Sequence, residues 1–91
     1  MSMSIQPQTL SGAEPIISSD EMYRRGLEAS VGGDDALSDL VTAHKWFNLA
    51  AIQGHQDARV YRAELALEMS QDQIAEAQRQ AREYLAANRS S

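Results

Sequence analysis

The chain has 91 residues, of which 43% are hydrophobic and 23% charged, and its formal net charge is -5. This length favours one domain, and the composition is that of an ordinary soluble globular protein. Phosphate contacts dominate nucleic-acid affinity, so eight Lys and Arg residues spread among thirteen acids argue against nucleic acid as a partner. The absence of cysteine excludes disulfides and thiolate metal sites.

The beginning of the sequence has no feature of a targeting or membrane segment. No apolar run approaches the roughly 18 residues that cross a membrane, and the first residues lack the basic start and apolar block of a secretory signal. We therefore expect a cytoplasmic protein without a membrane span. Residues 1–17 are rich in Ser, Gln, Pro and Gly, and Pro7 and Pro15 interrupt any helix, so we expect a flexible tail there.

The first predicted helix covers about residues 19–31. Ser18 and Glu21 have the spacing of a capping box, in which two side chains satisfy the free N–H groups at a helix start. Gly32 can close the helix, because glycine tolerates the left-handed backbone geometry that ends many helices.

The second and third predicted helices follow each other closely. Ser38 is the expected N-cap of a helix over residues 39–53, and Gly54 is expected to end it. The third helix is predicted over residues 56–69. The turn between them is so short that these two helices should be antiparallel neighbours.

The fourth predicted helix begins at a second capping box, formed by Ser70 and Gln73, and runs to about residue 87. The helical domain is thus expected over residues 18–88, with a frayed end at residues 89–91. No segment alternates polar and apolar residues as a strand would. The sequence therefore predicts an all-α fold of about four helices.

The four predicted helices differ in how many apolar sides they have. The first and the fourth have one, which is typical of outer helices with a solvated back. The second and the third carry a further apolar stripe on another side, formed by Val41, Leu49 and Ile52 and by Val60, Ala63 and Leu67. We therefore expect a short stack in sequence order, with these two helices in the middle and the fourth helix as a cap.

One segment also carries a pattern that is more specific than periodicity. Its members are Asp39, Ala43, Trp46, Phe47, Ala50, Ala51, Gly54 and Ala58. In order and spacing they resemble the second helix of a Sel-one-like (tetratricopeptide-like) repeat and the turn into the next repeat. Upstream, Gly26 and Gly32 fit the repeat's first helix and loop, although Arg25 replaces the usual Leu. The resemblance covers about residues 20–69.

This resemblance implies antiparallel helix hairpins stacked into a short α-solenoid, as in a small single-repeat protein of bacterial type. It also implies a protein–protein interaction module, an adaptor or scaffold, in place of an enzyme. The residues themselves favour such packing. Small side chains at 43, 50, 51, 54 and 58 let helices approach each other, while Trp46 and Phe47 fill the remaining volume.

A single clear repeat raises the question of what covers its ends, because about three repeats are usually needed for a stable stack. The second apolar stripes either pack inside this chain or face another protein or a second copy. The candidate binding residues are Val41, Leu49 and Ile52, with Arg24, Arg25, Glu28, Arg59 and Arg62 as a charged groove. Such a groove would suit an acidic peptide, and a simply solvated charged face is the alternative.

The sequence offers no recognisable catalytic or metal site. His44 and His55 lie eleven residues apart without a metal-ligand spacing, so we expect His44 beside the core and His55 in a turn. Asp34 and Asp35 follow two glycines, where helix termination or solvation explains them. We expect no enzyme activity and no cofactor. An assembly subunit of a larger enzyme complex, a small enzyme or ligand carrier, and a helical regulator remain as alternatives.

Overall fold

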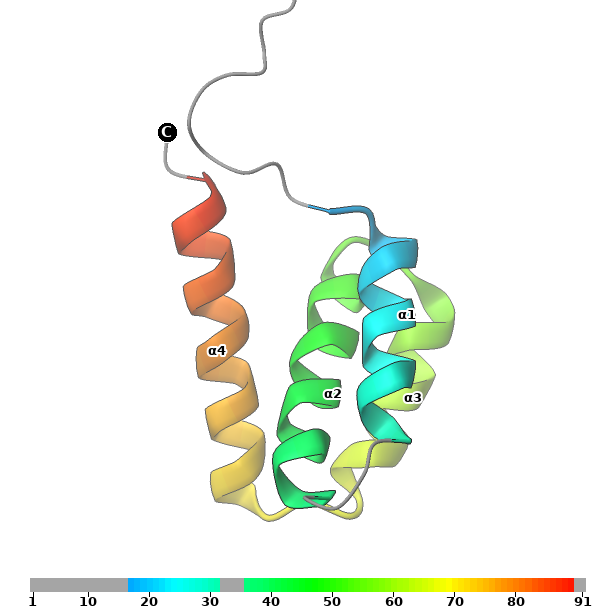
Figure 1. Ribbon diagram of the computed structural model, residues 1–91, viewed down its shortest axis with the longest axis vertical. Helices are drawn as coiled ribbons and strands as arrows, with labels where there is room; N and C mark the ends of the chain where they lie inside the picture. The colour runs from blue at the N-terminus through cyan, green and yellow to red at the C-terminus, as the bar shows by residue number, and fades with distance from the viewer. Residues whose placement is uncertain (1–16, 32–35, 90–91) are drawn as a thin grey trace, which may run out of the picture.

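The computed structural model describes residues 17–31 and 36–89 of the chain. Within them it contains four helices and no strand, which confirms the predicted all-α fold (Figure 1). The helices are α1 (Ser19–Ser30), α2 (Ala36–Ile52), α3 (Gln56–Ala66) and α4 (Gln71–Arg89). The predicted tail before residue 17, Gly32, the pair Asp34 and Asp35, and the last two residues lie outside the described residues.

Two of the predicted helix boundaries are wrong by three residues. Helix α2 begins at Ala36, so Ser38 lies inside its first turn and is not its N-cap. Alanine and leucine at 36 and 37 are good helix formers, and they extend the helix towards the N-terminus. Helix α3 ends at Ala66, because residues 67–69 form successive tight turns in which each N–H bonds the carbonyl three residues earlier.

Side chains cap three of the helices, two of them in the predicted places, whereas His55 was predicted only as a turn residue. The Ser18 hydroxyl accepts the Glu21 N–H at 3.1 Å at the start of α1. At the start of α4 the capping box is complete: Ser70 Oγ accepts the Gln73 N–H at 3.1 Å, and Gln73 Oε1 accepts the Ser70 N–H at 2.8 Å. His55 Nδ1 accepts an N–H of the first turn of α3 at 3.2 Å. Each cap satisfies a donor that the helix itself leaves free.

Helix α2 is the centre of the domain, and the three other helices all pack against it. Figure 1 shows α1 and α3 on one side of α2 and α4 on the other, with α1 and α3 running opposite to α2 and α4 running in the same direction. The prediction that the third helix lies between two neighbours is therefore wrong. Helix α4 covers α2 instead, and it leaves the outer side of α3 uncovered by the described residues.

The core is built from one aromatic ring surrounded by small residues. Phe47 of α2 is fully buried, and so are Ala43, Ala50 and Ala58. On α1, a Cβ at Gly26 would lie 2.5 Å from Phe47 Cε1, closer than two carbon atoms can approach, so glycine is what allows the Phe47 ring to lie against α1. Of the five small residues predicted to let the helices approach, Ala43, Ala50 and Ala58 lie in this core, whereas Ala51 is half-buried and Gly54 is exposed, with no atom beyond its chain neighbours within 4 Å of its Cβ position.

Candidate functional site

The apolar stripe predicted on the second helix is only partly available for binding. Leu49 is 1% exposed and belongs to the core, so its assignment to a binding surface is wrong. It is buried because α2 has neighbours on several sides. Ile52, at the end of α2, is 58% exposed, and Val41 is half-buried. The stripe is thus divided between the interior and the surface.

The second apolar stripe of α3 is exposed along its whole length. Val60 is 57% exposed, Leu67 is 87% exposed, and Ala63 between them is exposed as well. The opposite side of the same helix provides the buried Ala58 and the half-buried Leu65 of the core. The sequence correctly identified two apolar sides on this helix, and the structure shows that only one of them is covered.

Around this stripe the surface is slightly hollowed. Residues of α3 alone line a shallow depression of about 520 Å³: Gln56, Arg59, Val60, Arg62, Ala63 and Glu64. We call Gln56, Val60, Ala63 and Leu67, with Arg59 along one edge and Glu64 along the other, the open face of α3. It combines an apolar strip with charges of opposite sign on its two sides.

The charged side chains of α1 that were predicted to bind a partner already form ion pairs on their own helix. Arg24 bonds Glu21 at 2.5 Å and Glu28 at 2.8 Å, and Arg25 bonds Glu21 at 3.1 Å. Hydrogen bonds from the two guanidinium groups lower the pKa of the Glu21 carboxyl. Exposed pairs of this kind contribute little to stability, but a partner would have to break them before it could bind here.

The predicted groove lined by the arginines of both helices is not formed. The Arg25 guanidinium lies over the Trp46 ring, 5.2 Å from its centroid, whereas Arg62 Nη1 donates to Asn48 Oδ1 at 2.6 Å. Residues 46 and 48 point about 160° apart on α2, because each residue of an α-helix turns the chain by about 100°. The two arginines therefore lie against different sides of α2.

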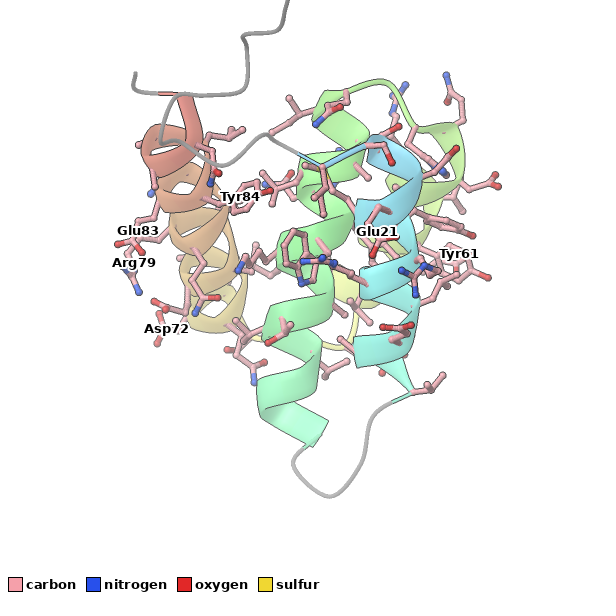
Figure 2. All side chains as sticks on the ribbon, turned by 45° about the horizontal axis from the view of Figure 1, so that its top comes forward. Glu21, Tyr61, Asp72, Arg79, Glu83 and Tyr84 are labelled. Carbon is pink, nitrogen blue, oxygen red and sulfur yellow. The ribbon has the colours of Figure 1, made fainter. Side chains whose placement is uncertain are left out.

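A second cluster, of cations on aromatic rings, joins α1 and α4 to α2. Lys45 Nζ lies 4.6 Å from the Trp46 ring centroid, and the Trp46 and Tyr84 rings meet edge to face at 5.4 Å. Figure 2 shows Tyr84 pointing from α4 towards α2. Desolvation, and then the charge of Arg25, lower the pKa of Lys45. Sequence analysis named Trp46 and Arg25 separately and did not predict that they meet; no sequence pattern indicates that Lys45 and Tyr84 join them.

The outer side of α4 is a solvated, charged surface. Arg79 bridges Glu76 and Glu83 on its own helix, and the side chains of Asp72, Arg79 and Glu83 point away from α2 (Figure 2). Hydrogen bonds from Arg79 and Gln80 lower the pKa of Glu76 to about 2. This helix matches the polar-backed outer helix that the sequence predicts.

Both histidines have structural positions. His44 is 3% exposed, which confirms its predicted place beside the core, and its Nδ1 has no hydrogen-bond partner among the described residues. Burial lowers the pKa of His44, and the charge of Arg62 acts in the same direction, so its imidazole is neutral near pH 7. His55 caps α3, stacks on Tyr23 at 4.3 Å and places Nε2 3.2 Å from Asp20 Oδ1.

Among the described residues, no three His, Cys, Asp or Glu side chains are grouped so that they could hold a metal ion. Within the same ranges, no helix has both the length and the apolarity that a membrane crossing requires. Comparison of the chain with protein-family models, with curated proteins and with solved structures gives no match. The resemblance to Sel-one-like repeats therefore rests on the residues named above.

Proposed function

We propose that this chain is a cytoplasmic protein–protein interaction module, an adaptor or scaffold without catalytic activity, and that it binds through the open face of α3. One observation carries the proposal: Val60 within α3 and Leu67 at its C-cap expose 57% and 87% of their surface on the same side. Single exposed apolar residues are common on proteins, but two in register on either side of an alanine form a strip that another helix fits.

The energetics favour this face over the other surfaces. Full burial of a Val or Leu side chain stabilises by about 1.5–3 kcal/mol, so covering Val60 and Leu67 offers about 3 kcal/mol even after their present partial burial is subtracted. A partner on the outer side of α4 would gain no such term, and at the end of α1 it would cover one exposed apolar side chain, Val31, without a second beside it. It would first have to separate charged side chains that now bond each other, such as Arg24 with Glu28 and Arg79 with Glu76.

The resemblance to Sel-one-like repeats supports the same surface. In a stack of helix pairs, each unit covers an apolar face of the unit before it, and the last unit needs a cap. We interpret α1 and α2 as one such pair and α3 as the beginning of the next. On this interpretation the open face of α3 is the place where a further helix would be added, and the added helix comes from a binding partner.

The test compares the proteins that co-purify with three forms of the chain. In the first variant, Val60→Asp and Leu67→Asp together place two carboxylates on the open face of α3. The matched control, Ala75→Asp, places a carboxylate on the exposed back of α4. We expect the double variant to lose the bound proteins identified by mass spectrometry, and the control to keep them.

Circular dichroism must show the same helicity in all three forms, since the substituted side chains are exposed. A Val60→Asp/Leu67→Asp variant that is folded and retains every partner would refute the proposed binding face. The same measurement with Ile52→Asp tests whether the exposed end of α2 belongs to the surface.

A further inference from the structure

We propose that the open face of α3 pairs with the open face of a second copy of this chain, with the two α3 helices parallel and related by a two-fold axis along their length. This inference rests on the proposed function and names the partner of the same site. The spacing of the residues along the face, and the charges along its two edges, favour a second copy as the binding partner.

The apolar strip has the spacing of a helix-pairing seam. It is formed by the apolar Val60 and Ala63, by the polar Gln56 before them, and by Leu67, the C-cap that follows α3 with a helical backbone; these residues are separated by four, three and four positions. This is the alternation that keeps one side of a helix facing a partner helix in a coiled coil. Ala63 in the middle lets two helices approach closely, and the exposed Val60 and Leu67 then pack beside it.

The charges decide the direction of the pair. With about 100° per residue, Arg59 lies about 100° to one side of Val60 and Glu64 about 40° to the other. The acidic edge also contains Glu68, whereas Arg62 lies further round the helix and bonds Asn48 of α2. A self-pairing helix with edges of opposite sign must bring each edge against the opposite edge of its copy.

Only the parallel arrangement does this. A two-fold axis along the helices places the Arg59 edge of one copy against the Glu64 edge of the other, and the reverse pair forms on the far side. The two residues are five positions apart, which is the spacing of the ion pairs between parallel helices. An antiparallel pair would instead place Arg59 near Arg59 and Glu64 near Glu64, and like charges repel.

The contact is small, and this sets the expected affinity. One three-turn helix from each copy buries less than the roughly 1,200 Å² that stable complexes bury. We therefore expect a reversible dimer with a Kd on the order of 10–300 µM that weakens as salt screens the exposed ion pairs. Sedimentation velocity of the full chain over about 5 µM to 1 mM covers this range.

Charge exchange at one pair of residues provides the test. Arg59→Glu and Glu64→Arg should each weaken the dimer about tenfold or more, because each variant brings like charges together twice. An equimolar mixture of the two variants should restore association, since both ion pairs re-form in the heterodimer. The double variant should also restore it. Arg82→Glu, on the exposed back of α4, is the matched control and should leave the wild-type Kd unchanged.

Cysteine cross-linking tests the direction independently, because the chain contains no cysteine. Under mild oxidation, Gln56→Cys should form a covalent dimer with itself in the parallel pair. In an antiparallel pair centred on the strip, residue 56 would face residue 67 of the other copy. Cross-linking only in a mixture of Gln56→Cys and Leu67→Cys would overturn the parallel arrangement.

The outcomes separate this inference from the proposed function. A chain that stays monomeric up to about 1 mM overturns the self-pairing. If the chain is monomeric but the Val60→Asp/Leu67→Asp variant loses other proteins that the wild-type chain binds, the proposed function stands with a different partner. A dimer that is not recovered by mixing the two charge variants overturns the assignment of Arg59 and Glu64.

Discussion

Replacing Gly26 with alanine tests the packing on which the domain depends. The new Cβ would lie 2.5 Å from Phe47 Cε1 and 2.6 Å from Cδ1. Ordinary carbon contacts are about 3.5–4.0 Å, so the ring and the helix would have to separate by about 1 Å. The Phe47 ring is fully buried, so it can move away only by displacing the side chains packed around it.

Two opposing terms set the size of the effect. An extra methyl group in a filled core destabilises by about 1–3 kcal/mol, and a contact this short belongs at the upper end. Alanine is better than glycine inside a helix by about 1 kcal/mol, which offsets part of the strain. We therefore expect Gly26→Ala to lower the free energy of unfolding by about 2 kcal/mol, and to lower Tm by about 8–16 °C for a domain of this size.

The assay is urea unfolding followed by circular dichroism, performed as a double-mutant cycle with Phe47→Leu. Leucine removes the ring atoms that meet the new methyl group. Gly26→Ala should therefore be neutral or stabilising when Leu stands at position 47, and the two substitutions should couple by about 2 kcal/mol or more. If Gly26→Ala stabilises the wild-type chain, or costs the same in both backgrounds, the packing argument for Gly26 is incorrect.

Three further predictions concern single side chains. Because burial lowers the pKa of His44, the unfolded chain binds this proton more tightly than the folded chain. Stability should fall as pH drops below about 6.5, and His44→Leu should flatten that fall in urea titrations between about pH 7 and pH 5. Removal of the α3 cap by His55→Ala should lower the free energy of unfolding by about 1 kcal/mol in thermal melts. His55→Asn should retain most of the wild-type stability, because Asn can also cap a helix. Trp46→Ala should destabilise by about 2 kcal/mol and speed hydrogen exchange in α4 more than in α1; equal changes in both helices would contradict the contact with Tyr84 as the main attachment of α4.

Local features of the fold were predictable from the sequence. The capping box of Ser70 and Gln73 forms as expected, and of the box predicted at Ser18 and Glu21 the Ser18 half forms, while the Glu21 carboxylate bonds Arg24 and Arg25. Gly54 ends α2 with a φ of 94°, a backbone geometry that glycine adopts without strain. The start of α2 was wrong because Ser38 is a good cap in isolation, but the residues before it extend the helix.

The place of each helix in the domain was less predictable. The pattern of apolar residues shows which sides of a helix can be buried, but it does not show which neighbour buries them. Leu49 and Leu67 were equivalent on this criterion, and the structure buries the first and exposes the second. The difference depends on where α4 lies, and no short sequence pattern encodes a contact between α2 and α4 that spans more than twenty residues.

The open face of α3 is therefore a consequence of where α4 packs. This helix has one apolar side, and that side can cover either the Trp46 side of α2 or the Val60 side of α3, but not both. On α2 it meets the broad Trp46 ring, and Tyr84 makes an edge-to-face contact with that ring. Two fully or nearly buried alanines of α4, Ala77 and Ala81, further let α4 approach closely. Since α4 packs on α2, the uncovered strip on α3 has no helix of the described chain left to cover it, and in the proposed dimer a second copy supplies one.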